Sequence, residues 1–322
     1  MSAPTISQST GSVAVPERRV PPPPWLVVSA FAAVYMIWGS TYFGIHLAIQ
    51  SIPPFLMGGA RFLAAGLLLY AVMRARGEPG PEPVHWRDAT IIGGLLLLVG
   101  NGGVSWAQQT VPSGIAALMV GATPLWMNLI DWIRPSGERP RAAVFGGIAL
   151  GFLGVVLLVS SKDRLGNSVV EPWGGAVLLL APLCWAAGSV FSRHACKPVA
   201  ALQAIAMQMI AGGVLLLLTG VLTGEPGRFD PGRVTLSSML AFGYLTVMGS
   251  LVGFTAYVWL LQVSTPARVS TYAFVNPFIA VLLGWLFLSE PISSGVIVAG
   301  GLIIAAVALI TTAGSANQPR PR

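Results

Sequence analysis

Apolar stretches long enough to form membrane helices recur along almost the whole chain. A bilayer core about 30 Å thick needs roughly 20 apolar helical residues to cross it. Only 9% of the 322 residues are charged and the mean hydropathy is +0.75, whereas about 25% of the residues in an ordinary soluble domain are charged. The sequence therefore predicts an all-α membrane protein.

Ten such stretches can be counted, and turn-forming residues separate them. Proline precedes several of them, as is typical of a first helical turn, where its missing amide proton leaves no bond unmade. The runs 93–99 and 212–218 are apolar on every helix face, unlike a soluble amphipathic helix. The predicted spans are 25–47, 54–73, 88–108, 112–133, 142–159, 173–192, 199–222, 236–261, 266–288 and 293–312.

Basic residues are distributed unevenly over the two predicted membrane faces. With ten spans, both tails share a face with the loops after spans 2, 4, 6 and 8, and this face holds twelve of the 18 Lys and Arg residues. The other face holds four, and Arg61 and Arg268 fall inside spans. Because cytoplasmic loops carry the excess of basic residues, we predict that both termini are cytoplasmic. The net charge of +7 is explained by the basic residues of the predicted cytoplasmic face. We therefore expect no nucleic-acid partner.

The two halves of the chain repeat each other. The matched pairs are Trp38 and Trp185, Arg61 and Gln208, Gln109 and Gln262, Pro124 and Pro277, and Gly146-Gly147 and Gly300-Gly301, at offsets of 147, 147, 153, 153 and 154 residues. With five spans in each half, the second half would enter the membrane upside down. Inverted repeats are typical of alternating-access transporters, which bind substrate near the midplane between the halves.

This repeat predicts how the chain is divided. We expect an unstructured cytoplasmic tail over 1–24, a first five-helix repeat over 25–160 and an external linker over 161–172. A second, inverted five-helix repeat over 173–312 and a cytoplasmic tail over 313–322 would follow.

Several motifs occur in a specific order along the chain: Trp38-Gly-Ser-Thr, Arg61-Phe-Leu-Ala-Ala-Gly, Val111-Pro-Ser-Gly-Ile-Ala-Ala, Tyr272-Ala-Phe-Val-Asn-Pro and Glu290-Pro. In these motifs the chain resembles the EamA-type transporters of the drug/metabolite transporter superfamily, over about residues 25–312. The resemblance implies a ten-helix carrier of two inverted five-helix repeats. Such carriers sit in the bacterial inner membrane and commonly export amino acids or related metabolites.

Polar and aromatic residues inside the predicted spans are the candidates for substrate binding, because unpaired polar groups are costly within a bilayer. Amides, hydroxyls and indole rings suit a neutral or zwitterionic solute with an apolar side chain. The alternative for the hydroxyls is hydrogen bonding between helices. The candidates are Trp38, Ser40, Thr41, Tyr42, Asn101, Trp106, Trp185, Ser189, Tyr272 and Asn276.

Five further residues are predicted to shape or support this site. Gly39, Gly100, Pro124 and Pro277 would act as hinges or cavity-shaping positions, although a tolerated kink explains the prolines equally well. Arg61 is the one charge placed deep in a span. It could hold a substrate carboxylate through a bidentate contact or act as a structural lock, and its uncharged match Gln208 favours the structural role.

Acidic residues are scarce inside the predicted spans. Asp131 is the one carboxylate assigned to a span, near its cytoplasmic end, and Glu290 is expected to cap the outer end of span 9. Coupling to protons or sodium usually uses a carboxylate buried in the bundle. The sequence thus predicts facilitated, weakly coupled or exchange transport rather than tight proton antiport.

Other classes of protein fit the sequence less well. The histidines are scattered and no Cys/His cluster has metal spacing, so we expect no enzyme activity, catalytic residue, metal or cofactor. A channel would need a filter or a selectivity ring. A flippase for a lipid or polyprenyl-linked substrate is the strongest alternative to an exporter of neutral or aromatic amino acids. The expected partners are a small-molecule substrate and the lipid bilayer, and the sequence leaves the oligomeric state open.

Overall fold

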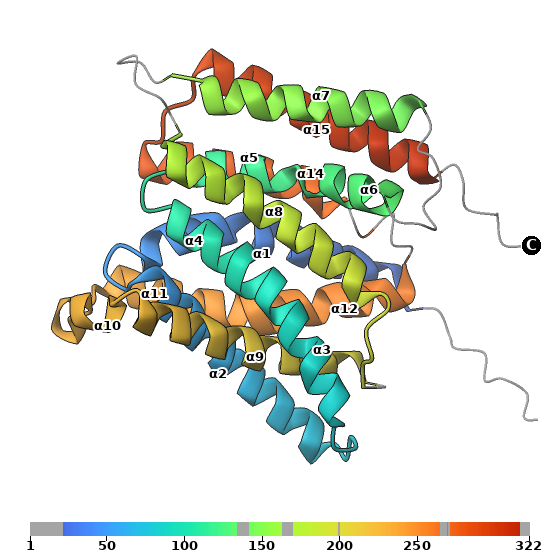
Figure 1. The fold of residues 1–322 in the computed structure, drawn as a ribbon, viewed down its shortest axis with the longest axis vertical. Helices are drawn as coiled ribbons and strands as arrows, with labels where there is room; N and C mark the ends of the chain where they lie inside the picture. The colour runs from blue at the N-terminus through green and yellow to red at the C-terminus, as the bar shows by residue number, and fades with distance from the viewer. Residues whose placement is uncertain are drawn as a thin grey trace, which may run out of the picture.

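The computed structural model describes residues 22–133, 142–162, 170–198, 200–264, 269 and 271–315, which form a bundle of helices (Figure 1). The first half contains α1 (Pro24–Ala48), α2 (Pro54–Ala75), α3 (Pro83–Gly93), the π-helical η1 (Gly94–Gly102), α4 (Gly103–Ala107), α5 (Ser113–Gly121), α6 (Thr123–Ile133) and α7 (Ala142–Ser160). The second half contains α8 (Pro172–Ser192), α9 (Ala201–Leu222), the short α10 (Glu225–Arg228), the 3₁₀ turn η2 (Pro231–Arg233), α11 (Leu236–Tyr244), the π-helical η3 (Leu245–Val252), α12 (Gly253–Val263), α14 (Tyr272–Leu288) and α15 (Ser294–Ser315).

Within the described residues, eight helices are long and apolar enough to cross a membrane. Two shorter apolar helices, Val275–Leu288 and Ser294–Ile310, coincide with the ninth and tenth predicted spans. Large apolar side chains such as Leu222, Val156 and Phe287 lie exposed on the outside of the bundle, where lipid rather than water would cover them. The all-α membrane class is thus confirmed, while the count of ten spans and their inverted repeat stay predictions.

The third helix of each half contains a π-helical segment. Residues Pro83–Ala107 run as one continuous helix through η1, and Leu236–Val263 run as one helix through η3. The helix therefore continues through Gly100. Such segments are rare and occur frequently at functional sites.

The predicted span 112–133 is interrupted in the structure. α5 ends at Gly121 and α6 begins at Thr123, so Pro124 lies in the first turn of a new helix. Proline cannot donate to the carbonyl four residues earlier, and the Thr123 hydroxyl donates to that carbonyl, Val120 O, at 2.6 Å. The carbonyl freed by Pro124 is thus bonded locally.

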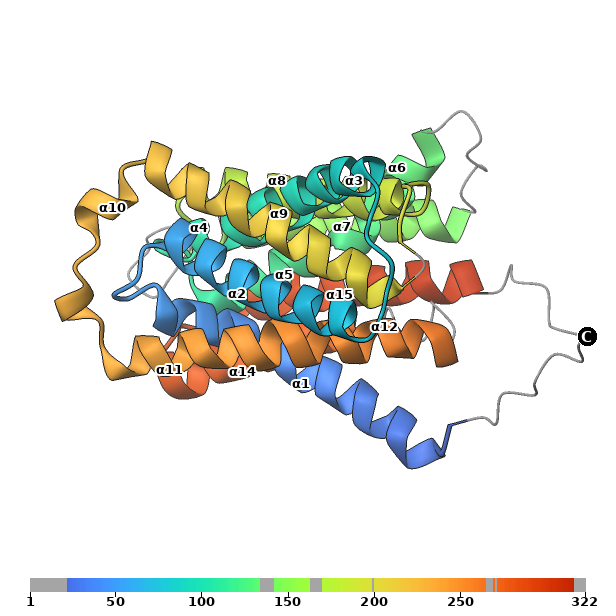
Figure 2. The ribbon, with the colours of Figure 1, turned by 90° about the horizontal axis from the view of Figure 1, so that it is seen from below.

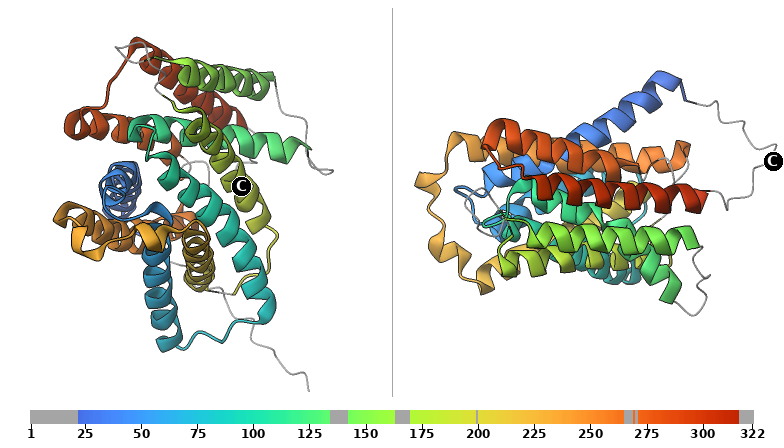
Figure 3. Two further views of the ribbon diagram at one scale, coloured as in Figure 1. Left: turned by 60° about the vertical axis from the view of Figure 1, so that its left-hand side comes forward. Right: turned by 90° about the horizontal axis from the view of Figure 1, so that it is seen from above.

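Helices from the two halves pack in pairs. α2 packs along α9 and α7 packs along α15, the latter pair at one edge of the bundle (Figures 1 and 3). α1 packs against both α12 and α14. α1 begins and α15 ends at the same end of the bundle, and α10 lies at the opposite end (Figure 2).

Glycines allow the closest of these approaches. A Cβ on Gly154 of α7 would lie 3.0 Å from Ala299 O and 3.1 Å from Ile303 N, both backbone atoms of α15. Gly151 lies against Leu125 of α6. Gly146, on the exposed face of α7, has no atom within 4 Å of such a Cβ.

This difference makes a testable prediction. Gly154→Ala should destabilise the protein by about 1–3 kcal/mol, because the α15 backbone must shift to admit the methyl group. Gly146→Ala should be neutral or stabilising, because alanine favours helix by about 1 kcal/mol over glycine. Thermal unfolding in detergent measures both, and equal melting temperatures for the two variants would contradict the packing.

Carboxylates bond to helix ends across the fold. Glu290 accepts from the amides of Ser113 and Gly114, so it caps the start of α5. Its own backbone amide donates to Gly284 O at 3.1 Å near the end of α14, so the residue also closes the end of span 9, as expected. Glu225 accepts from the amides of Phe55 and Leu56 at the start of α2. Negative charge is stabilising at a helix N-terminus, and both glutamates therefore tie helices together at the end of the bundle that holds α10.

A further carboxylate is buried within a membrane-length helix. Asp88 in α3 is 2% exposed, is paired with Arg87 at 2.8 Å and accepts from the amide of Cys196 at 2.8 Å. The expectation that Asp131 alone lies inside a span is therefore wrong, although Asp88 is near the helix start. The Asp131 side chain, like residues 265–268 with Arg268, is outside the described part of the chain.

Candidate functional site

An aromatic cluster lies where α1, α12 and α14 meet. The Trp38 ring is 5.3 Å from Phe254, 5.1 Å from Tyr257 and 5.1 Å from Tyr272, measured between centroids. The rings of Tyr257 and Tyr272 are themselves 5.9 Å apart. Edge-to-face ring pairs at these distances are favourable, so the four side chains form a preformed aromatic wall inside the bundle.

A backbone approach fixes the Trp38 ring against the second half. Trp38 Nε1 donates to Gly249 O at 3.3 Å, and a Cβ on Gly253 would lie 2.5 Å from the same nitrogen. Both glycines belong to the continuous helix that contains η3. The absence of side chains at these two positions lets the indole lie directly on the helix backbone.

The matched tryptophan makes the matched contact. Trp185 of α8 lies against Gly100 in η1, with its Cε3 2.9 Å from the position of a Cβ. Gly100 and Gly253 are separated by 153 residues, the same offset as Pro124 and Pro277. Each tryptophan thus packs on a glycine in the third helix of the opposite half. No ring contact joins Trp38 to Trp185 among the described residues.

Three predicted hydroxyls bond to their own helices. Thr41 donates to Trp38 O at 2.6 Å, and Ser189 donates to Trp185 O at 2.7 Å. The Ser40 hydroxyl reaches Met36 O and also the hydroxyl of Tyr244 on α11, at 2.6 Å. These bonds leave the hydroxyls partly satisfied within the protein, as in the alternative of local and interhelical bonding.

Asn276 and its neighbours connect α1 to α14. With its nitrogen turned to donate, the Asn276 amide reaches Tyr272 O at 3.2 Å and Tyr35 O at 3.3 Å. The hydroxyls of Tyr35 and Thr271 are 2.5 Å apart. Gly39 allows this approach, since a Cβ there would meet Ile279 of α14 at 2.8 Å. Gly39 and Asn276 therefore hold the two helices together next to the aromatic cluster.

The remaining predicted residues lie in two environments. Tyr42 and Trp106 pack against the largest apolar cluster, which includes residues of α5, α7 and α15. Pro277 lies inside α14 and would contact a Cβ on Gly121 at 2.9 Å. The side-chain amide of Asn101 in η1 has no hydrogen-bond partner in the described chain, although its carbonyl accepts from Ser105.

Arg61 is buried against η3. Arg61 is only 3% exposed. Its Nε donates to Ser250 Oγ at 2.9 Å, and its guanidinium carbon lies 4.6 Å from the centre of the Phe62 ring. Its Nη2 lies 3.0 Å from the position of a Cβ on Gly249, the residue whose carbonyl accepts from Trp38. Arg61 and Trp38 therefore contact the same residue of η3.

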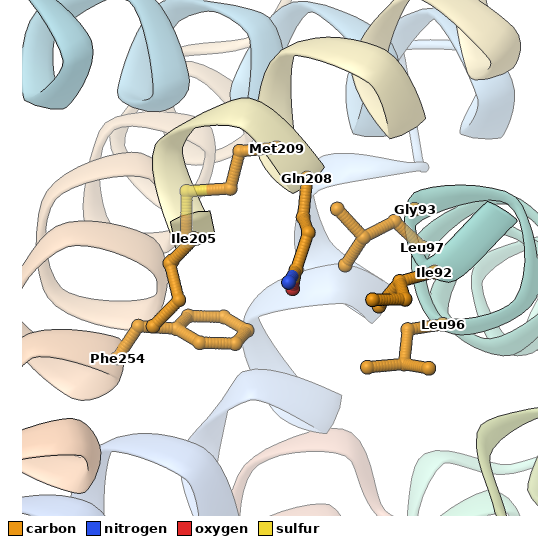
Figure 4. Close-up of a pocket in the computed structure, with 8 residues that line it drawn as sticks. All are labelled: Ile92, Gly93, Leu96, Leu97, Ile205, Gln208, Met209 and Phe254. Atoms are coloured by element: carbon orange, nitrogen blue, oxygen red, sulfur yellow. The ribbon is translucent and has the colours of Figure 1, made fainter. Parts of the chain in front are cut away.

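Gln208, the match of Arg61, points into a pocket between α9, the α3–η1 helix and α12 (Figure 4). The pocket is small, with a cavity volume of about 10 Å³, roughly the space of one water molecule. Its lining residues are Ile92, Gly93, Leu96, Leu97, Ile205, Gln208, Met209 and Phe254. Phe254 also packs on Trp38, so a single ring separates this pocket from the aromatic cluster.

The sequence analysis did not name Ser250, Phe254 or Tyr257 as residues of this region. It named Gln208 only as the match of Arg61 and not as a residue that lines a pocket. Phe254 and Tyr257 stand in an apolar run where a lipid-facing aromatic would look the same. The repeat offset of 153 residues, applied to Gly100, would have pointed to Gly253 and hence to its neighbours.

A helical bundle with an apolar exterior, an aromatic wall and a buried cation defines a multi-pass membrane protein with a polar interior site. The chain belongs to the EamA-like transporter family, whose model matches residues 25–160 and again residues 172–312. It is therefore a membrane transporter of the drug/metabolite superfamily.

Individual relatives agree with this membership. The chain is 41% identical to the uncharacterized inner membrane transporter YedA of Escherichia coli K12 over 283 residues, covering 88% of this chain and 89% of YedA. It is 30% identical to protein PecM of Dickeya dadantii, covering 85% and 88% of the two chains. One solved crystal structure shares the fold, with a TM-score of 0.61 and 22% identity over 89% of this chain and 98% of that one.

Proposed function

We propose that this transporter exports small metabolites, namely neutral or aromatic amino acids, by alternating access around a cavity between its two halves. The cross-contacts of the tryptophans carry this proposal: Trp38 of the first half lies on Gly253, and Trp185 of the second half lies on Gly100. Exchange of matched contacts between halves is what an inverted repeat with a central site requires. The aromatic wall around Trp38 offers a surface for an apolar or aromatic side chain.

The location and the orientation of the chain form part of the proposal. YedA is an inner membrane transporter by name, and twelve basic residues against four favour cytoplasmic termini. α1 begins and α15 ends at one end of the bundle (Figure 2), which supports placing both tails on one side of a bacterial inner membrane. Glu225 and Glu290 would then close the outer end.

We propose that transport is facilitated or only weakly coupled to an ion gradient. Coupled carriers usually use a carboxylate that a proton or cation can reach near the midplane. The buried carboxylates of the described chain are Asp88, paired with Arg87, and Glu225, which caps α2. Both already have partners at helix ends, which supports an exporter driven by its substrate gradient.

Uptake into proteoliposomes tests the function. We expect saturable uptake of labelled neutral or aromatic amino acids, lost about tenfold or more in Trp38→Ala and Trp185→Ala because a central aromatic anchor typically contributes 2 kcal/mol or more. Trp173→Ala is the control, since this side chain is on the same helix as Trp185 and 74% exposed. It should retain full uptake.

Two outcomes would change the proposal. Uptake by the tryptophan variants at the wild-type rate would move the substrate site away from the aromatic cluster. Folded protein that transports no amino acid, with or without a pH gradient, but moves a fluorescent lipid between leaflets would favour a flippase.

A further inference from the structure

Arg61 has an unmatched positive charge inside the bundle. Guanidinium groups have five N–H donors, and the described chain offers this one a single hydrogen-bond acceptor, Ser250 Oγ. No carboxylate of the described residues lies within 4 Å of it. A buried cation without a partner is costly, so the site is electrostatically complete only when an anion is bound.

The surroundings orient the guanidinium rather than neutralise it. Ser250 Oγ donates to Leu245 O at 3.2 Å, a bond that spans five residues of η3, and thereby leaves its lone pairs for Arg61 Nε. The ring of Phe62 supports the guanidinium carbon from one side. The Nη atoms are thus free of protein acceptors and held in place, which suits a planar two-oxygen anion.

The aromatic cluster begins at the same η3 residue. Arg61 Nη2 lies next to the Cα of Gly249, where a side chain would otherwise project. The carbonyl of the same glycine accepts from Trp38 Nε1. The methyl group of Thr41 also lies close to Gly249, 3.3 Å from the position of a Cβ. A ligand whose anionic end is at Arg61 would therefore have its apolar part beside the indole.

The matched position in the second half has no charge. Gln208 replaces Arg61, and Leu97, at an offset of 153 residues, replaces Ser250. The resulting pocket is lined by apolar side chains apart from the Gln208 amide (Figure 4). The two matched positions therefore differ in polarity, so a ligand between them would be anionic at one end only.

We propose that Arg61 binds the carboxylate of the transported solute, whose aromatic or apolar part lies against the cluster of Trp38, Phe254, Tyr257 and Tyr272. The assignment rests on the proposed transport function and restricts its cargo to small monocarboxylates, including zwitterionic amino acids. Ser250 acts as a positioning residue for the guanidinium.

Three labelled probes that share a phenyl ring test this assignment with unmodified protein in proteoliposomes. L-Phenylalanine and phenylacetate carry the carboxylate, and phenethylamine lacks it. We expect saturable uptake of at least one carboxylate, with uptake of phenethylamine lower by about 10- to 100-fold, as the loss of a hydrogen-bonded charge pair predicts. This comparison does not depend on any variant folding.

Variants then test the residue. Arg61→Gln should raise the KM for the carboxylate probe about 10- to 100-fold and abolish the rise in melting temperature that the probe gives wild-type protein in detergent. Ser250→Ala should raise the KM less and leave kcat unchanged. Arg74→Gln is the control, because Arg74 is on the same helix but exposed.

The outcomes separate the two proposals. Equal uptake of phenethylamine and phenylalanine, or an Arg61→Gln variant that is folded and has an unchanged KM, would overturn the carboxylate site and leave the transporter intact. Uptake of an uncharged sugar but of neither carboxylate would do the same. Protein that transports none of these compounds would contradict both proposals.

Discussion

Gly253→Ala is expected to reduce transport by about 10- to 100-fold while the protein still folds. The new methyl group would lie 2.5 Å from Trp38 Nε1 and 3.0 Å from its Cδ1, closer than any stable contact. The indole must move, which breaks its bond to Gly249 O and its packing on Phe254 and Tyr272. Overpacking of this kind costs about 1–3 kcal/mol. If that strain falls on the substrate-bound state, it converts to a loss of affinity of about 10- to 100-fold.

The chain provides a matched control for this variant. Gly243 lies ten residues earlier in the same continuous helix, and a Cβ there meets no atom within 4 Å. Gly243→Ala should keep the wild-type initial rate in proteoliposomes and an equal or higher melting temperature. Wild-type transport by Gly253→Ala would show that the position of Trp38 is irrelevant to the solute.

The contact of Trp185 on Gly100 allows the same comparison in the first half. Gly100→Ala places a methyl group 2.9 Å from Trp185 Cε3, whereas Gly94→Ala places one at an ordinary 3.5 Å from Leu215. Loss of transport in both Gly253→Ala and Gly100→Ala, but in neither control, would support a site shared by the two halves.

Glu225→Ala is expected to destabilise the protein by about 3 kcal/mol and to lower its melting temperature by on the order of 5 °C or more. The carboxylate is 2% exposed and accepts from Phe55 N at 3.2 Å and Leu56 N at 2.8 Å. Its removal leaves two amides at the start of α2 unbonded and takes a negative charge from a helix N-terminus. Glu225→Gln keeps one acceptor and should lose about half as much.

The Glu-Pro-Gly sequence occurs twice, at 78–80 and 225–227, and this provides the control. Glu78 is only half-buried, and its side chain has no hydrogen bond in the described structure. Glu78→Ala should therefore leave the melting temperature in detergent unchanged. A similar loss for both glutamates would mean that the effect comes from net charge and not from the cap.

Composition and the apolar runs predicted the membrane class and the approximate bounds of the helices, because burial in lipid demands long apolar runs. Trp38 could be chosen from the sequence as a candidate binding residue, but its partners could not. Phe254 and Tyr257 are aromatic residues in an apolar run, and only tertiary packing distinguishes them from lipid-facing neighbours. The bond from Glu290 to the start of α5 could not be predicted, because it depends on amides 176 and 177 residues away.

The role of Arg61 was left open by the sequence for a related reason. A deep arginine predicts either a ligand or an internal partner, and the distinction depends on whether a carboxylate lies beside it. The structure places Ser250 there. The π-helical segments could not be recognised from composition, since η1 and η3, like regular spans, are mostly leucine, valine and glycine.

These π-helical segments make the two third helices sensitive to chain length at a point where composition is ordinary. Each residue of an α-helix turns the chain by about 100°, so deletion of one residue within Leu245–Val252 would turn α12 by that angle relative to α11. Gly253 would then face away from Trp38, and Phe254 away from its pocket, with the hydropathy of the span unchanged. We therefore expect the protein to tolerate the exchange of one apolar residue for another along η3 but not the loss of a single residue from it.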